Sequence, residues 1–150
     1  MSVWKPAVTV AAIIEREGRF LFVEEEAEGR RVLNQPAGHL EPGESLVAAV
    51  AREVLEETAH RFQPTALLGV YRWHYAPQDV TFLRFAFCGE AEGPEVGRPL
   101  DREILALHWL TPQELSARRT MHRSPLVERC VADYLAGKRF PLEALSREFA

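Results

Sequence analysis

The amino-acid sequence predicts one α+β domain, a sandwich in which helices cover the faces of a mixed β-sheet. Its 150 residues are one domain's length, and a chain of this size buries about 68–70% of its unfolded surface on folding. Hydrophobic residues make up 47% of the chain and charged residues 27%, which is typical of globular proteins. The predicted elements follow the order β-rich, helix, β-rich, helix without a repeat or linker, so we expect residues 1–150 to form a single domain.

The first β-rich segment contains a predicted hairpin. Residues 8–15 are apolar and β-branched, Glu17-Gly18 is a turn signal, and residues 19–24 return as a second strand. An acidic run follows at the end of that strand, and we expect a solvated loop there rather than a metal site. The run consists of Glu24, Glu25, Glu26 and Glu28.

Residues 46–59 are predicted to form the principal helix, after a short strand over 32–37 and a loop over 38–44. The helical segment is rich in Ala, Leu, Val and Glu, lacks Gly and Pro, and has Ser45 as its N-cap. After it we expect strands at 63–73, 80–90 and 104–110, with a loop over 91–101. Two further helices are expected to begin at Thr111-Pro112 and at Ser124-Pro125, the second ending near Ala136 before Gly137.

The net charge and the cysteines exclude several classes of protein. The formal charge of −4 argues against a protein that binds duplex nucleic acid, because such proteins carry a basic excess. Cys88 and Cys130 are too few for a disulfide framework and fit no zinc-ligand pair, so we expect them in the core. The N-terminus has no signal-peptide pattern and no apolar run is long enough to span a bilayer, so we expect a cytoplasmic protein without a membrane partner.

The principal helix carries the acidic residues that suggest chemistry. At about 100° per residue, Glu53, Glu56 and Glu57 fall within an arc of about 100°. Crowded carboxylates raise one another's pKa unless a cation is present, and Arg52 can compensate the charge of about one of them. A set of ligands that consists only of oxygen atoms suits Mg²⁺ or Mn²⁺ rather than Zn²⁺. Three glutamates alone also fit a solvated acidic face. The neighbouring arc, of about 140°, is apolar and can pack on a sheet: Val47, Val50, Ala51, Val54 and Leu55.

The residues before the helix favour the metal site. Over residues 38–60 the spacing is Gly-x5-Glu-x7-Arg-Glu-Val-x-Glu-Glu, formed by Gly38, Glu44, Arg52, Glu53, Glu56 and Glu57. This pattern resembles the Nudix box. The chain also resembles the NudJ-type Nudix phosphatases from about Val8 to Glu143, in the segments Asn34-Gln35-Pro36-Ala37-Gly38-His39-Leu40-Glu41, Phe82-Leu83-Arg84-Phe85, Arg123-Ser124-Pro125-Leu126-Val127 and Arg139-Phe140-Pro141-Leu142-Glu143.

The resemblance implies the Nudix fold, an α/β/α sandwich around a mixed sheet, and hydrolysis with Mg²⁺ or, as a substitute, Mn²⁺. NudJ-type proteins are phosphatases of nucleoside tri- and diphosphates and of the pyrophosphate of a thiamine precursor. The resemblance therefore implies a monomer that removes a terminal phosphate from a small-molecule substrate. An RNA 5′-pyrophosphohydrolase and a non-catalytic, nucleotide-sensing Nudix domain are the alternatives.

The end of the box departs from the family pattern. Ala59 stands where the family has Gly, and His60 stands where it has an aliphatic residue. Because a left-handed backbone costs a non-Gly residue about 1–2 kcal/mol, we expect Ala59 to stay helical and the helix to run toward His60 or Arg61.

The resemblance also implies the ligands of the metal and the residues around it. The expected ligands are Glu53, Glu56, Glu57 and the backbone carbonyl of Ala37. Glu44 and Arg52 would pair and fix the loop on the helix, and Gly38 would let the backbone approach the metal.

The expected chemistry is attack of water on phosphorus, with metal ions neutralising charge on the phosphoryl oxygens. Glu53 is the first candidate for the general base. Asp101 and Glu103, just before the strand at 104–110, are the other candidates, of which we prefer Glu103. Each of these two is equally consistent with an ordinary loop charge.

Substrate contacts are expected from residues around this loop and from two strands. Arg84 could meet a phosphate or pair with a glutamate, and neither is favoured. Trp73 could stack on a ring, although packing at the edge of the core is the favoured interpretation. Arg123 belongs to a basic cluster. The favoured interpretation of this cluster is a solvated helix end, and the second is a rim that faces the phosphates. The substrate-binding candidates are Gly38, Gln35, His39, Trp73, Arg84 and Arg123.

Overall fold

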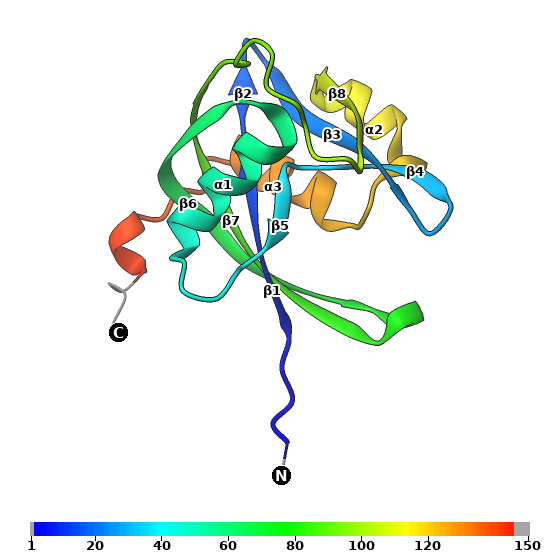
Figure 1. The fold of residues 1–150 in the computed structure, drawn as a ribbon, viewed down its shortest axis with the longest axis vertical. Helices are drawn as coiled ribbons and strands as arrows, with labels where there is room; N and C mark the ends of the chain where they lie inside the picture. Colours follow the sequence, from blue (N-terminus) through cyan, green and yellow to red (C-terminus); the bar gives the residue numbers. More distant parts are fainter. Residues whose placement is uncertain (1, 146–150) are drawn as a thin grey trace.

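Two β-sheets form the centre of the protein, which a computed structural model describes over residues 2–145 (Figure 1). The first sheet has the order β5-β1-β7-β6. Strand β1 lies parallel to β7 and antiparallel to β5, while β6 and β7 form a long antiparallel hairpin, so the predicted mixed sheet is confirmed. Its strands are β1 (Ala7–Ile13), β5 (Ala37–His39), β6 (Arg61–Tyr75) and β7 (Val80–Glu92).

The second sheet is antiparallel and has β3 at its centre. Strand β3 pairs with β2, β4 and β8. The predicted hairpin is therefore wrong in part, because the turn at Glu17-Gly18 joins β2 to β3, and β1 belongs to the other sheet. Both edges of β1 are already paired with β5 and β7, so it has no free edge for β3. The strands are β2 (Glu15–Arg16), β3 (Arg19–Ala27), β4 (Arg30–Asn34) and β8 (Ile104–Leu110).

The acidic run predicted as a solvated loop lies largely within β3. Glu24 and Glu25 are buried, each with 8% of its surface exposed. The reason is that β3 has β4 on one side and β8 on the other along this stretch. Glu24 accepts hydrogen bonds from Arg31 and pairs with His108, and Arg123 donates to Glu25, so both carboxylates have cationic or histidine partners.

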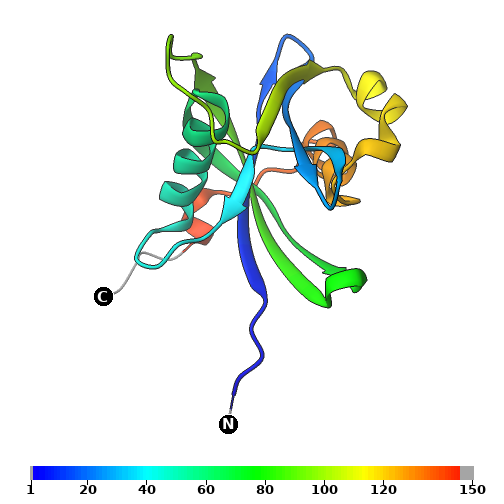
Figure 2. The same cartoon turned by 45° about the vertical axis from the view of Figure 1, so that its right-hand side comes forward.

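Helices cover opposite faces of the structure. Figure 2 shows α1 (teal) on one side of the strands and α2 and α3 (yellow to orange) on the other. Each side has its own apolar core: Val10, Val50 and Val54 lie beneath α1, whereas Phe22, Leu115 and Val131 lie beneath α2 and α3. The predicted α/β/α sandwich is confirmed. The helices are α1 (Leu46–Thr58), α2 (Pro112–Ala117) and α3 (Leu126–Leu135), with 3-10 turns η1 (Ala76–Gln78), η2 (Arg119–Met121) and η3 (Leu142–Ala144).

The start of α1 agrees with the sequence, and its end does not. Ser45 caps the helix, because its hydroxyl accepts a hydrogen bond from the amide of Ala48 at 3.1 Å. Ala59 does not continue the helix: it has φ 59° and ψ 18°, the left-handed conformation. The chain must turn at once from α1 into β6, and the carbonyl of Ala59 there accepts a hydrogen bond from Glu95 at 2.9 Å. Tertiary contacts thus outweigh the local conformational cost.

No helix among residues 2–145 is long and apolar enough to cross a bilayer. Cys88 and Cys130 are free thiols buried in the structure, as expected from the sequence.

Candidate active site

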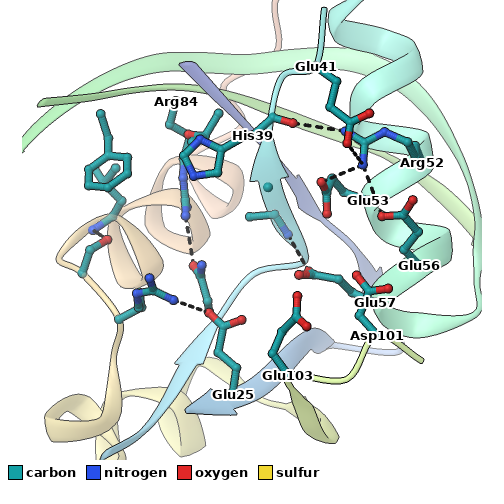
Figure 3. A pocket seen from close by; sticks show the side chains of 18 of the residues that line it. Glu25, His39, Glu41, Arg52, Glu53, Glu56, Glu57, Arg84, Asp101 and Glu103 are labelled. Atoms are coloured by element: carbon teal, nitrogen blue, oxygen red, sulfur yellow. Dashed lines mark hydrogen bonds and ion pairs between the residues drawn. The ribbon is translucent and has the colours of Figure 1, made fainter. Parts of the chain in front are cut away.

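A cavity of about 450 Å³ opens beside α1, β5 and the half of the β6–β7 hairpin nearer its turn (Figure 3). Carboxylates dominate its lining: Glu25, Glu41, Glu53, Glu56, Glu57, Asp101 and Glu103. The cationic or imidazole side chains in its wall are those of Arg52, Arg84, Arg123 and His39. The cavity thus brings together most of the residues that the sequence singles out.

The acidic face of α1 points into this cavity. Glu53 and Glu57 are buried and Glu56 is half-buried. This burial differs from the predicted packing face, because Ala51 and Leu55 are half-exposed whereas Glu53 and Glu57 lie on the buried side of the helix. The acidic residues are therefore held inside the protein, not on a solvated surface.

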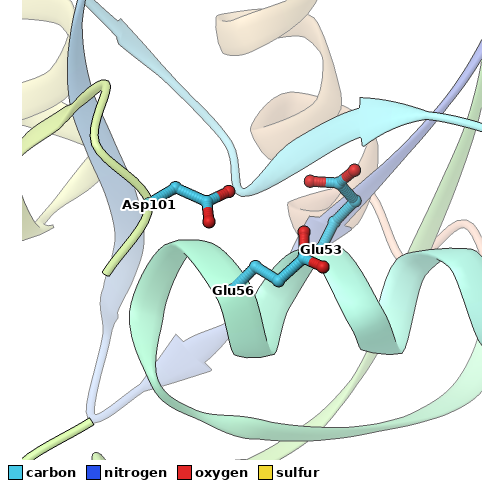
Figure 4. A group of neighbouring side chains, drawn as sticks. All are labelled: Glu53, Glu56 and Asp101. Atoms are coloured by element: carbon cyan, nitrogen blue, oxygen red, sulfur yellow. The ribbon is translucent and has the colours of Figure 1, made fainter. Parts of the chain in front are cut away.

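Asp101 joins this group from a distant part of the chain. Carboxylate oxygens of Glu53, Glu56 and Asp101 all lie within 4.8 Å of one another (Figure 4). The backbone N–H of Asp101 donates to the carbonyl of Glu56 at 3.0 Å, using a carbonyl in the last turn of α1 that has no partner within the helix. From the sequence, Asp101 is expected only as a candidate general base. No spacing in the sequence links it to the helix, because the link is a tertiary hydrogen bond.

Burial makes these carboxylates costly to ionise. It raises the pKa of Glu53 to about 7 and the pKa of Glu57 to about 9. Burial also raises the pKa of Asp101, and the nearby charge of Glu103 adds to the effect. The carboxylates of this site offer only oxygen atoms as metal ligands. Their burial keeps part of this negative charge away from water. This donor set fits a hard divalent cation.

Glu57 also fixes the loop that precedes α1. Its Oε1 accepts a hydrogen bond from the backbone N–H of Ala37 at 2.9 Å. Next to it, Gly38 leaves no room for a side chain: a Cβ there would lie 2.1 Å from Cδ of Glu53. The close approach that Gly38 permits is therefore an approach to the Glu53 carboxylate.

Arg52 organises the other end of the acidic face. Its Nε and Nη2 donate to the two carboxylate oxygens of Glu44 at 3.0 and 2.7 Å, a bidentate pair that lowers the pKa of Glu44. Its Nη1 donates to Glu53 at 2.8 Å and to Glu56 at 3.2 Å. Arg52 thus compensates two carboxylates of the face, where the sequence suggested about one. Glu44 does not line the cavity, and it holds Arg52 in place.

Arg84 lies opposite the acidic residues and has no carboxylate partner among residues 2–145. It is 6% exposed, and its guanidinium donates to Oε1 of Gln35 and Oδ1 of Asn34, each at 2.9 Å. Gln35 itself is 1% exposed and donates to the carbonyl of Val127 at 2.7 Å. Gln35 does not reach the cavity as the sequence suggested, and instead it orients Arg84. The result is a guanidinium in the wall of the cavity that is held by the side-chain oxygens of two amides.

The remaining candidates line the cavity around Arg84. Arg123 pairs with Glu25 at 2.5 Å. Trp73 is half-buried and stacks on Phe82, with ring centroids 5.6 Å apart and planes at 19°. His39 lies 6.5 Å from the ring of Phe82, and Glu103 lies near Asp101. Trp73 therefore forms part of the cavity wall as well as packing against its neighbour.

Comparisons with known proteins identify the family of the chain. The sequence matches the NUDIX domain over residues 3–130. It is 42% identical over 142 residues to Phosphatase NudJ of Escherichia coli (strain K12), which covers 95% of this chain and 92% of that protein. Phosphatase NudJ of Shigella flexneri matches to the same extent.

Solved structures give the same assignment. A NUDIX hydrolase from Nitrosomonas europaea has a TM-score of 0.93 and 50% identity, covering 96% of this chain and 98% of that one. The MutT NUDIX hydrolase from Burkholderia pseudomallei, with a TM-score of 0.72 and 22% identity, covers 87% of this chain and 98% of that one and shows the fold alone. From the match over residues 3–130 and from these relatives, we conclude that the chain belongs to the Nudix family and is a hydrolase of pyrophosphate bonds.

Proposed function

We propose that this protein is a Mg²⁺-dependent Nudix phosphatase, with Mn²⁺ as a substitute, that removes a terminal phosphate from small substrates. Its substrates are nucleoside tri- and diphosphates or the pyrophosphate of a thiamine precursor. The observation that carries this proposal is a cavity with two faces: a cluster of buried and half-buried carboxylates on one, and on the other the guanidinium of Arg84, which has no carboxylate partner among residues 2–145. The 42% identity to proteins named Phosphatase NudJ supports removal of a single phosphate.

The carboxylate face would hold the metal. Glu53, Glu56 and Glu57 are the proposed ligands, with the carbonyl of Ala37, and Asp101 joins them because its oxygens lie beside those of Glu53 and Glu56. When bound, the metal supplies positive charge to the phosphoryl oxygens and to the attacking water. Arg52 and Glu44 keep the carboxylates in place through the hydrogen bonds described above.

The guanidinium face would hold the substrate's phosphates. Arg84 is oriented by Gln35 and Asn34 and has donors left for phosphoryl oxygens. Arg123, at the rim, would exchange its pairing with Glu25 for a phosphate. Gly38, His39 and Trp73 form the surrounding wall against which the rest of the substrate would rest.

Glu53 is the proposed general base. It lies beside the metal cluster and is oriented by Arg52 at 2.8 Å, so it can accept the proton of a water that attacks phosphorus. Glu103, which also lines the cavity, is the second candidate. Glu103→Gln decides between them: if Glu103 is the base, turnover falls by about 100-fold or more while the affinity for Mg²⁺ stays unchanged, whereas if Glu53 is the base, this variant keeps most of its turnover. Glu53→Gln does not decide, because it also removes a proposed metal ligand.

The direct test is a substrate panel with identification of the products. The purified protein with Mg²⁺ should release orthophosphate from GTP, GDP and the pyrophosphate of the thiamine precursor, and EDTA should stop the reaction. Release of inorganic pyrophosphate as the first product would overturn the phosphatase assignment. A strong preference for 5′-triphosphorylated RNA over GTP would favour an RNA pyrophosphohydrolase, and no turnover of any substrate would favour a binding domain.

The oligomeric state, compartment and partners of the protein are also part of this proposal. We propose a cytoplasmic monomer that acts on small molecules without binding duplex nucleic acid or membranes. Its net charge of −4 supports this, since duplex nucleic acid and anionic membrane surfaces attract basic proteins. Sedimentation at micromolar concentrations would test the monomeric state.

A further inference from the structure

A second cavity of about 270 Å³ adjoins the catalytic one. The two share Trp73, Phe82 and Arg123 in their walls. Glu53, Glu56, Asp101 and Arg84 line only the first cavity, whereas the charged side chains of the second are those of Glu26, Glu28, Arg30 and Arg123. Its complete lining is Glu26, Ala27, Glu28, Arg30, Val32, Trp73, Tyr75, Gln78, Phe82 and Arg123.

Two hairpins from different sheets enclose this second cavity. The β3–β4 turn supplies Glu28, and the tip of the β6–β7 hairpin, with η1, supplies Tyr75 and Gln78 (Figure 2). Glu28 joins them: one carboxylate oxygen accepts from the hydroxyl of Tyr75, and the other accepts from Nε2 of Gln78 at 2.7 Å. The carboxylate of Glu28 is thus held at a defined place in the wall.

One wall contains a stack of three aromatic side chains. Trp73 lies between Phe82, at 5.6 Å and 19° between planes, and Tyr75, at 5.3 Å and 36°. These side chains come from adjacent strands, where Trp73 and Phe82 are directly paired. The outer face of such a stack beside a phosphate site suits a flat ring, since stacking on an aromatic side chain contributes about 1–3 kcal/mol for a base.

We propose that the second cavity binds the planar heteroaromatic ring of the substrate, and that Glu28 selects rings that present an amino group. This proposal rests on the proposed function, which places the phosphates of the same substrate between Arg84 and the metal. An ionised carboxylate only accepts hydrogen bonds and has about four acceptor positions, of which Tyr75 and Gln78 use two. A ring amino group can donate to a remaining position, whereas a ring carbonyl in the same place would face another oxygen and be repelled.

CTP and UTP form the matched pair that tests this selection, because the two rings differ by an amino group in place of a carbonyl. In the unaltered protein, kcat/KM for CTP should exceed that for UTP about tenfold, as expected for one hydrogen bond to a charged group. The kcat/KM of each nucleotide is compared with the kcat/KM of inorganic tripolyphosphate, which has the phosphates but no ring. In Glu28→Gln the CTP-to-UTP ratio should fall to near one, because the amide can donate as well as accept.

Glu17→Gln is the control. Glu17 has φ 53° and Glu28 has φ 52°, and each stands before a Gly in a hairpin turn, but Glu17 lies outside both cavities. Glu17→Gln removes the same charge and should leave the CTP-to-UTP ratio unchanged. A ratio near one in the unaltered protein, or a ratio that Glu28→Gln does not change, would overturn the proposal.

Equilibrium binding separates this inference from the proposed function. If neither the nucleotides nor tripolyphosphate is hydrolysed, the proposed function fails, and calorimetry with CMP and UMP then tests the ring site by itself. Tighter binding of CMP that Glu28→Gln abolishes would support the site, whereas equal affinities for CMP and UMP would overturn it.

Discussion

Glu57 has one structural contact, with the backbone of Ala37, and one proposed contact, with the metal. A suitable substitution keeps the first and weakens the second. Oε1 of Glu57 accepts the hydrogen bond of Ala37 that anchors the loop, and its charge belongs to the proposed metal site. Glutamine in its place keeps an oxygen for Ala37 and removes the charge. The loop should therefore remain folded while the metal loses a ligand.

For Glu57→Gln we expect turnover to fall by about 100-fold or more, since even changes behind a metal ligand typically cost 10–100-fold. The measurement is kcat at saturating Mg²⁺, with thermal unfolding of the metal-free protein as the control for folding. Near-normal Mg²⁺-dependent turnover in this variant would contradict the metal assignment.

Arg84 is a buried guanidinium whose direct partners are the neutral side chains of Asn34 and Gln35, with Cys130 Sγ at 3.9 Å. Arg84→Lys keeps the positive charge but replaces a planar fork by a single ammonium group. We expect KM for nucleoside triphosphates to rise about tenfold, because one charge-assisted hydrogen bond is worth about 1.5–3 kcal/mol. The affinity for Mg²⁺ should not change. An unaltered KM together with a loss of thermal stability would show that Arg84 serves only the fold.

At the scale of the element, the end of α1 is strained. Ala59 adopts φ 59° although it carries a β-carbon, and it is buried at 3% exposure. Ala59→Gly removes the steric cost of about 1–2 kcal/mol but increases the entropy of the unfolded chain, which offsets part of the gain.

We therefore expect Ala59→Gly to raise the free energy of unfolding by about 1 kcal/mol or less and to leave kcat nearly unchanged. Urea denaturation measures the first quantity and steady-state kinetics the second. A large change in kcat would mean that the conformation at Ala59 affects the active site. A loss of stability would mean that the methyl group's packing outweighs its strain.

At the scale of the whole molecule, the catalytic cavity concentrates negative charge between elements that lie far apart in the chain. Carboxylates come from β3, α1 and the segment before β8 and converge in this cavity. A divalent ion that binds them should stabilise the folded chain over the unfolded one, in which they are separated.

At a Mg²⁺ concentration about 100 times the dissociation constant, stabilisation should reach about 2.7 kcal/mol, which raises Tm by about 5–10 °C for a chain of this size. Thermal unfolding in Mg²⁺ and in NaCl of equal ionic strength measures the effect, and NaCl controls for screening. Glu57→Gln should reduce the Mg²⁺ shift. Equal shifts in the two salts would argue against a specific site.

The principal helix and its acidic face were determined by the sequence alone. Ser45 caps the helix where predicted, and Glu53, Glu56 and Glu57 share a face because helical periodicity relates residues three and four apart. The pairing of Arg52 with Glu44, which the resemblance to the Nudix box implies, joins one loop to the helix that follows it. Features of this kind depend on neighbours in the chain, so a pattern in the sequence is sufficient to identify them.

Only the tertiary structure decided which distant residues complete the site. Asp101 reaches Glu56 through a backbone hydrogen bond to the end of α1, Gln35 lies behind Arg84, and Glu25 is buried because β3 is paired on both sides. The left-handed conformation of Ala59 has the same origin, since the turn into β6 overrides a local preference worth about 1–2 kcal/mol. These features depend on which strands pair and which loops meet, and packing free energy summed over the whole chain decides that.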